Sequence, residues 1–380
     1  MVGGGIGGLA AARGLQLAGW SVRVLERAAD LESLGAGLSL FPNAVRALGA
    51  LGVELPAGRL PGPGGIRARN GRWLSRSDPA AYPERYGAPL VAVHRASLQR
   101  VLLEALVPGT VMTGARVAEV RAGDGGPLVV RHDTEELGAD LVVLADGAAS
   151  GTRGLVTGGR PRPVHAGYTA WRGVMEAGPG TAVADGATES WGRGERFGIV
   201  PLADGRIYWF ATANAPEGGR SPDGEHAELL RRFSGWHAPV PDVLRATDPG
   251  AVLRHDVYEL LPHPRSYVRG RVVLLGDAAH VMSPNLGQGA CQALEDAATL
   301  GAVLLPAGAD VDAGLAAYDR ARRPRARRIA RRSAQIGRIA QLDGRFSSAA
   351  RDHVIRWTPD LLTRRQLDDV LQWDVPARLG

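Results

Sequence analysis

The 380-residue sequence predicts an α/β fold in which a parallel-sheet domain is interrupted by an antiparallel sheet and followed by a helical C-terminus. Short apolar strands at residues 140–145 and 271–277 indicate the parallel sheet, because each precedes a glycine-rich turn or a helix. Residues 167–261 contain alternating segments rich in Trp, Tyr and Phe, which are typical of an antiparallel sheet. Residues 313–342 have apolar side chains at helical spacing.

These patterns recur along the chain, so each domain is built from separate segments. We expect the parallel-sheet domain to comprise residues 1–63, 90–163 and 267–312, the antiparallel sheet residues 64–89 and 164–266, and the helical region residues 313–380.

Composition and charge narrow the possible partners. The net charge is +6, and all 45 basic residues are arginine, since the chain contains no lysine. The basic run at residues 320–332 is either a solvated helix face or a phosphate-binding surface; we favour the former and expect no nucleic-acid partner. Cys291 is the only cysteine, so we expect no disulfide and no metal site. No apolar run could span a bilayer and no leader pattern is present, which predicts a cytoplasmic protein without a membrane partner.

The first motif is G-x-G-x-x-G at Gly3, Gly5 and Gly8, followed by helical spacing and by a strand ending at Glu26. Such glycines bring the backbone close to a pyrophosphate at a helix N-terminus, and the acid accepts hydrogen bonds from ribose hydroxyls. Arg27 beside it leaves recognition of a 2′-phosphate open. Only two residues precede Gly3, so the first strand is either short or trimmed.

Two further motifs follow buried strands. Asp146 begins the run DGAASGTR, and Asp277 lies in GDAAH, after which PNLGQG opens a helix. With the first motif, this order and spacing resemble the FAD-dependent aromatic-ring monooxygenases of the p-hydroxybenzoate hydroxylase-like family, and most closely the salicylate hydroxylase-like branch. The resemblance covers nearly the whole chain. It implies a glutathione-reductase-type FAD-binding domain interrupted by the substrate sheet.

The resemblance also implies which residues contact the cofactor. They are Gly3, Gly5, Ile6, Gly7 and Gly8 at the pyrophosphate, Glu26 with its neighbour Arg27 at the ribose, Val117 at adenine, Arg95 at a phosphate or the ribityl chain, Gly37 at the flavin, Asp277 at the ribityl hydroxyls, Pro284, Gly287, Gln288 and Gly289 around the isoalloxazine, and Asp146 serving both FAD and the nicotinamide coenzyme. Amides at a helix start favour the negative charge of a reduced flavin. Taken singly, Asp146 and Asp277 could instead be helix caps.

The implied reaction is hydroxylation. NAD(P)H reduces FAD, O2 adds at flavin C4a to form a hydroperoxide, and an aromatic or similarly electron-rich small molecule receives one oxygen. An FAD-dependent reductase of related fold and a flavoprotein partner without turnover remain alternatives. The absence of lysine argues against a flavin halogenase.

Several single residues allow two interpretations. Arg172 either positions the substrate, which is the only catalytic role we assign, or ties the sheet to the FAD-binding domain. We favour a structural role for His280 over that of a base, and a buried packing role for Cys291 over that of a nucleophile. Four sheet aromatics line the substrate pocket or belong to the core, and we favour the core: Trp191, Phe197, Trp209 and Phe210.

Overall fold

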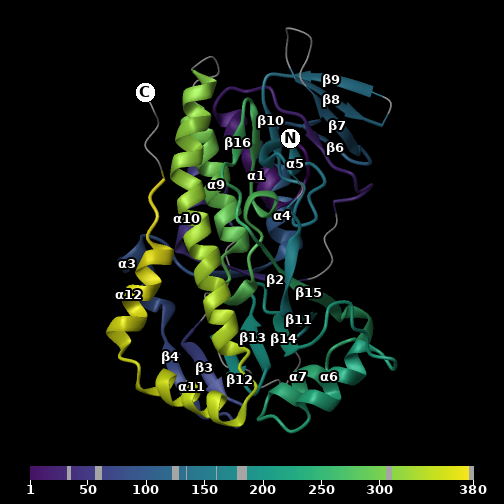
Figure 1. Cartoon of the computed structure of the whole chain (residues 1–380). Coiled ribbons are helices and arrows are strands. Elements are labelled where there is room, and N and C mark those ends of the chain that lie inside the picture. Colours follow the sequence, from purple (N-terminus) through teal and green to yellow (C-terminus); the bar gives the residue numbers. More distant parts are fainter. Residues whose placement is uncertain are drawn as a thin grey trace.

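The structure is a computed structural model that describes residues 1–31, 36–55, 62–121, 128–133, 135–159, 161–177, 186–304 and 310–375. It confirms the α/β class with an inserted sheet and a helical C-terminus. The parallel sheet lies in the upper half of Figure 1 and the large inserted sheet in the lower half, with the helix α10 (Val311–Ala340) running past both.

The parallel sheet is built from very short strands. In it β1 (Val24–Leu25) pairs with β6 (Val111–Met112), and β10 (Val142–Leu144) pairs with β17 (Val272–Leu274). Val2 joins the two pairs through isolated parallel bridges to Leu25 and Leu144, so the first strand is a single bridged residue. The strand predicted at residues 21–26 is likewise reduced to β1. At the edge, β16 (Val268–Arg269) pairs antiparallel with β17.

Two long apolar helices cover this sheet. The helix α1 (Ile6–Leu17) packs on α9 (Gly289–Val303), and a Cβ on Gly14 would lie 2.9 Å from the carbonyl oxygen of Ala297. This close approach explains small residues on both helices. α9 is the helix that the sequence predicts after PNLGQG.

The inserted sheet has seven strands in the order β15-β11-β14-β13-β12-β3-β4. All neighbours are antiparallel except β12 and β3, so the sheet is mixed rather than purely antiparallel. Its strands are β3 (Gly64–Ala68), β4 (Trp73–Ser77), β11 (Pro163–Met175), β12 (Thr188–Trp191), β13 (Glu195–Pro201), β14 (Ile207–Asn214) and β15 (Leu253–Leu260). The helices α6 (Glu225–Phe233) and α7 (Val240–Arg245) contribute to the buried core on one face of this sheet.

Shorter elements complete the fold. A small antiparallel sheet consists of β7 (Val117–Arg121), β8 (Leu128–His132) and β9 (Glu135–Ala139), and β2 (Gly37–Leu40) pairs with β5 (Val91–His94). The remaining helices are α2 (Pro42–Ala50), α3 (Tyr82–Tyr86), α4 (Arg95–Glu104), α5 (Gly154–Thr157), α8 (Asp277–His280), α11 (Arg345–Trp357) and α12 (Asp360–Leu371). None of the described helices is both long and apolar enough to cross a membrane.

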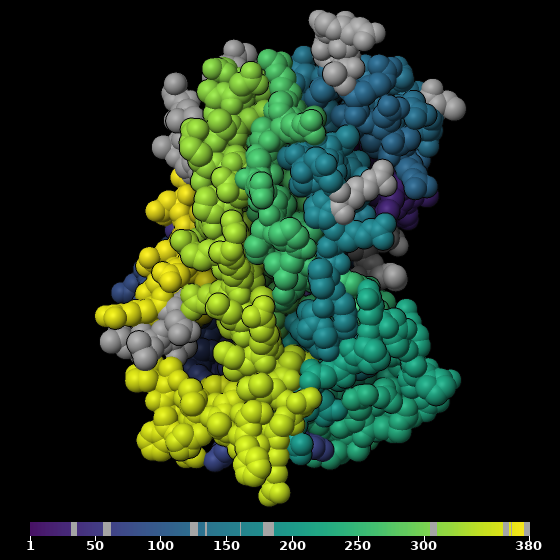
Figure 2. Space-filling model, viewed as in Figure 1, coloured from purple at the N-terminus to yellow at the C-terminus, as the bar shows by residue number. Residues whose placement is uncertain are grey.

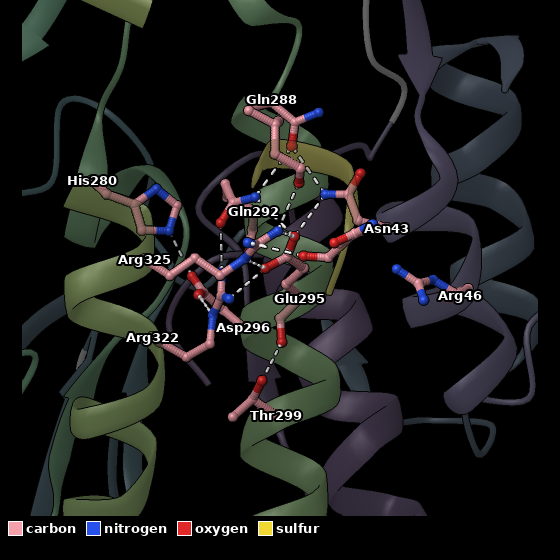
Figure 3. Close-up of polar contacts among 12 residues, drawn as sticks. Asn43, Arg46, His280, Gln288, Gln292, Glu295, Asp296, Thr299, Arg322 and Arg325 are labelled. Carbon is pink, nitrogen blue, oxygen red and sulfur yellow. Dashed lines mark hydrogen bonds and ion pairs between the residues drawn. The ribbon is translucent and has the colours of Figure 1, made fainter. Parts of the chain in front are cut away.

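The basic run on α10 departs from the solvated face that the sequence predicts. Arg322 is 1% exposed and binds the carboxylates of Glu295 and Asp296, both of which are fully buried on α9. Arg325 adds a second ion pair to Glu295, at 2.7 Å (Figure 3). Arg322 and Arg325 lie three positions apart and therefore on the same face of α10, the face that packs on α9. The buried carboxylates of Glu295 and Asp296 on α9 require cationic partners there.

Candidate active site

A cavity of about 390 Å³ lies where the FAD-binding motifs meet the inserted sheet. One part of its wall comes from the first turn of α1, the turn before α8 and the start of α9. The other part comes from strands β11 to β14 of the sheet. A single cavity therefore borders both the nucleotide-type motifs and the substrate sheet.

Two helix N-termini open onto this cavity. Gly5, Ile6 and Gly7 line it at the start of α1, and Gly287 and Gly289 line it at the start of α9. Neither helix has a side-chain cap or an acid in its first turn. Free amides and the positive ends of both helix dipoles thus face the same space, which favours negatively charged ligand groups.

The glycines of the first motif serve two different purposes. A Cβ on Gly8 would lie 2.0 Å from the carbonyl oxygen of Gly3, so this position must be glycine for the turn to pack on the helix. A Cβ on Gly5 would meet no protein atom within 4 Å. Since Gly5 lines the cavity, the space beside it is open to a ligand that approaches the backbone.

Glu26 lies behind this loop rather than in the cavity wall. Its carboxylate accepts hydrogen bonds from the amides of Gly4, at 2.6 Å, and Ala28, at 2.9 Å. A carboxylate has about four acceptor positions. Glu26 therefore fixes the glycine loop and retains acceptor capacity for hydroxyl groups.

The acids of the second and third motifs lie on either side of a buried arginine. Arg153 donates to the carbonyl oxygens of Ala148 at 2.9 Å and of Ala278 at 2.6 Å, so it joins the two loops. Asp277 is exposed at the cavity and makes no hydrogen bond to a described side chain. Asp146 accepts from Thr152, while its Oδ1 is buried without a partner. Asp277 is thus available to a ligand in the cavity, whereas the free oxygen of Asp146 is buried outside the cavity wall.

On the sheet side of the cavity, every second side chain of β14 lines the cavity wall. Tyr208, Phe210 and Thr212 line the cavity, whereas Trp209 is fully buried on the opposite face. Such alternation is the period of two of a strand. A Cβ on Gly37 would lie 2.4 Å from Cγ of Tyr208, so the tyrosine ring accounts for this glycine.

Arg172 lies on the neighbouring strand, opposite Phe210, and lines the same cavity. It makes no ion pair with any described residue. It lies beside Tyr208. Burial raises the pKa of the Tyr208 hydroxyl, and the positive charge of Arg172 offsets only part of this rise. The cavity wall thus contains an arginine that forms no ion pair within the described part of the chain.

A second arginine, Arg196, is held rigidly in the wall. It is 2% exposed and donates to Glu189 at 3.1 Å, to Asn285 at 2.8 Å and to Gln341 at 2.7 Å. Glu189 itself borders the cavity, and its second carboxylate oxygen makes no hydrogen bond to a described residue. The contact with Arg196 thus leaves one carboxylate oxygen of this cavity-lining glutamate without a hydrogen bond in the described part of the chain.

The structure divides the predicted site residues into two groups. Those that line the cavity are Gly5, Ile6, Gly7, Gly37, Arg95, Arg172, Asp277, Pro284, Gly287 and Gly289. Those outside its wall are Gly3, Gly8, Glu26, Arg27, Val117, Asp146 and Gln288. Gln288 is 1% exposed and turns inward, where its Oε1 accepts from Asn43 at 2.9 Å (Figure 3).

The structure also shows the surroundings of the residues for which the sequence allows two roles. His280 is fully buried and lies 2.6 Å from Asp296, which supports its structural role. Cys291 is buried, and burial raises the pKa of its thiol to about 12, so it is not a nucleophile. Of the four sheet aromatics, only Phe210 lines the cavity. Phe197 and Trp209 stack in the core with ring centroids 5.6 Å apart.

Sequence reasoning missed four residues of this region: Arg153, Glu189, Arg196 and Tyr208. The alternation around Phe210 could have indicated Tyr208. Arg153 is the last residue of the DGAASGTR run, so that motif could have indicated it, whereas the buried Arg196 has no such local signal. Among the described residues, no group of three or more His, Cys, Asp or Glu side chains could hold a metal ion.

The fold and cavity define a dinucleotide-dependent oxidoreductase with its cofactor loops facing a substrate sheet. Residues 1–333 match the model of the FAD binding domain family, and the chain belongs to this family. It is an FAD-dependent monooxygenase, with FAD as cofactor and NAD(P)H as reductant.

Similar proteins span nearly the whole chain. Aurachin C monooxygenase/isomerase of Stigmatella aurantiaca is 41% identical over 374 residues, which cover 97% of each chain. FAD-dependent urate hydroxylase of Klebsiella pneumoniae is 36% identical over 332 residues, which cover 86% of each chain. The crystal structure of Klebsiella pneumoniae HpxO complexed with FAD and uric acid superposes with a TM-score of 0.90 at 32% identity, covering 97% of this chain and 95% of that one. These similarities confirm the resemblance to aromatic-ring monooxygenases.

Proposed function

We propose that this enzyme hydroxylates a small planar aromatic or heterocyclic molecule that carries an acidic hydroxyl or ring N–H, with O2 as the oxygen source. The observation that carries this proposal is the unneutralised Arg172 in a cavity wall that also contains Tyr208 and Phe210. A guanidinium without a carboxylate partner fits an anionic oxygen or nitrogen of the ligand, and the aromatic rings fit a planar ring. Relatives named for urate and for 3-amino-4-hydroxybenzoate support this class.

The residues present fit FAD. The open space beside Gly5 at the start of α1 fits a pyrophosphate, and the free carboxylate of Asp277 fits the hydroxyl groups of a polyol. Asp146 lies outside the cavity wall and has one buried carboxylate oxygen without a partner. Gly3, Gly8 and Glu26 shape the loop from behind, and Arg95 adds a cation to the wall. The bound flavin supplies hydride acceptance and oxygen activation. We propose that the amides at Gly287 and Gly289 stabilise negative charge on its ring.

We further propose that Glu189 acts as the base. Arg196 holds one of its oxygens at 3.1 Å, which leaves the other oxygen, Oε2, to accept a proton from the substrate hydroxyl or N–H. Proton removal makes the ring more electron-rich, and Arg172 then stabilises the resulting anion. Positioning of this kind requires the rigid support that Asn285 and Gln341 give to Arg196.

The test is a screen of aromatic and heterocyclic compounds, with the purified holoenzyme and NADH or NADPH. We expect compounds with an acidic hydroxyl or N–H to stimulate coenzyme oxidation, and the product mass to increase by one oxygen. Matched compounds in which that hydroxyl or N–H is methylated should not be oxygenated. Equal turnover of both series would overturn the proposed substrate class.

A further inference from the structure

The helix α11 carries an unusual outward face. Phe346 is 86% exposed, Val354 is 64% exposed and Trp357 is 69% exposed. At 100° per residue, Phe346, Ala350 and Trp357 fall within about 40° of one another, with Val354 at their margin. We call these four residues the α11 stripe. Isolated exposed apolar residues are ordinary, but several on one helix face mark a binding surface.

The opposite face of α11 is the one that packs on the protein. Arg351 donates to the carbonyl oxygens of Ala340, at 2.9 Å, and Gly192, at 2.8 Å, and its guanidinium lies over the Trp191 ring. Ser348 is buried beside it. The helix is therefore anchored by its polar face, so the stripe points away from the molecule. In Figures 1 and 2, α11 forms the lower edge of the protein.

Basic residues flank the stripe. Arg345 at the start of α11 and Arg356 at its end lie on one side of Phe346, about 80–100° around the helix. Neither makes an ion pair with a described residue, and the same holds for Arg338 on the last turn of α10. Of the two acids nearby, Asp352 is paired with Arg351 and Asp343 accepts from Asn214. The surface thus combines apolar side chains with free positive charge.

We propose that the α11 stripe docks on an anionic membrane surface. Trp and Phe are favoured at a lipid–water interface, and arginines beside them are attracted to anionic headgroups. The sequence predicts no membrane partner because no apolar run could span a bilayer. A helix that lies flat in the interface does not need such a run. This proposal does not depend on the identity of the substrate.

A second copy of the chain fits the stripe less well. A 13-residue helix is about 20 Å long and presents roughly 200 Å² of surface, whereas a stable dimer buries about 800 Å² on each partner. A two-fold pairing of antiparallel α11 helices would also place Arg345 of one copy near Arg356 of the other. Like charges across a desolvated contact oppose such a pairing.

The experiment is co-sedimentation of the full-length holoenzyme with vesicles. We expect binding to vesicles that contain phosphatidylglycerol, and binding at least about tenfold weaker to vesicles of phosphatidylcholine alone. Raising the salt concentration from about 0.1 M to about 1 M should weaken binding, because the Debye length falls from about 10 Å to about 3 Å. Binding that is equal for both lipids would overturn the proposal.

Substitutions in the α11 stripe and in its flanking arginines test whether this surface binds the vesicles. Phe346→Ser with Trp357→Ser should reduce vesicle binding at least about tenfold, and Arg345→Gln with Arg356→Gln should abolish the preference for phosphatidylglycerol. The control is Val107→Ser, an exposed valine on a distant turn, which should bind as the wild type does. FAD content and thermal unfolding should be unchanged in all variants, since these side chains are solvent-exposed. Wild-type dimers that dissociate in the Phe346→Ser, Trp357→Ser variant, without vesicle binding, would instead assign the stripe to a second copy.

Discussion

The guanidinium of Arg153 lies 2.6 Å from the carbonyl oxygen of Ala278, although the two residues are 125 positions apart in the chain. The same side chain also reaches Ala148 and Asp277 carbonyl oxygens, at 2.9 Å and 3.1 Å. Burial lowers the pKa of Arg153, while Asp146 and Asp277 raise it. This single buried cation therefore holds together the loops of the second and third motifs.

Replacement of Arg153 by lysine should loosen both loops. A lysine ammonium cannot reproduce the planar fork of donors, so at least one buried carbonyl loses its partner. We expect the free energy of unfolding to fall by about 2–3 kcal/mol and FAD to dissociate more readily. Urea unfolding and flavin fluorescence measure the two effects. The matched control is Arg100→Lys on the exposed face of α4, which should change neither.

Gly5 and Gly8 should respond differently to the same substitution. Gly8→Val drives a side chain into the Gly3 carbonyl and should prevent folding of the loop. Gly5→Val meets no protein atom, and Gly5 already has an extended backbone, with φ at −74° and ψ at 179°. This variant should fold normally but bind FAD at least about tenfold more weakly, since the valine occupies the space proposed for the cofactor. Undiminished FAD affinity in Gly5→Val would exclude that placement.

Glu189→Gln should affect turnover and not cofactor binding. Loss of a general base lowers the rate by about 10²- to 10⁴-fold, while FAD content should remain full. Glu119→Gln is the control, since Glu119 has the same 3.1 Å contact to an arginine on a neighbouring strand far from the cavity. A Glu189→Gln variant that turns over as fast as Glu119→Gln would show that Glu189 is not the base.

The buried ion pairs between α9 and α10 (Figure 3) should contribute strongly to the free energy of unfolding. Arg322→Met leaves two fully buried carboxylates, Glu295 and Asp296, with fewer cationic partners. We expect the free energy of unfolding to fall by about 3–5 kcal/mol. Arg328→Met, on the exposed side of the same helix, should change it by less than about 0.5 kcal/mol. Similar losses in the two variants would contradict the assigned role.

His263 should make stability depend on pH. Burial, then the nearby Arg327 and Arg331, lower its pKa to about 4 in the folded protein. The unfolded chain gains this proton near pH 6.5 and the folded protein resists it. The free energy of unfolding should therefore fall between pH 6.5 and about 4, by ~1–2 kcal/mol after solvent screening. In the His263→Gln variant this fall in the free energy of unfolding should be absent. Chemical denaturation of both proteins at several pH values across that range measures it.

The motif side of the cavity wall was predictable because its signals are local. Gly5, Asp277 and Gly287 belong to short motifs in which the turn itself determines what faces the cavity. Gln288 belongs to the same motif, yet the rotation of one residue at the start of α9 turns its side chain toward Asn43. Motif membership alone therefore does not settle which side chains face the cavity.

The substrate side was not predictable, because it depends on strand register and on distant partners. Glu189 and Arg196 meet across β12 and β13, and Arg196 also needs Gln341, which is 145 positions away. The inward turn of Arg322 likewise depends on the acids of α9. Helical spacing from Tyr318 and Ala326 places Arg322 on the buried face of α10, but the sequence does not show which acids it meets there.

The most direct test of the oxygenase assignment is turnover under ¹⁸O2, with a compound that stimulates coenzyme oxidation. The account predicts a product that contains one ¹⁸O atom from O2 for each coupled NAD(P)H oxidised. Coenzyme oxidation that yields a product with two added hydrogens and no ¹⁸O would contradict it and identify a reductase.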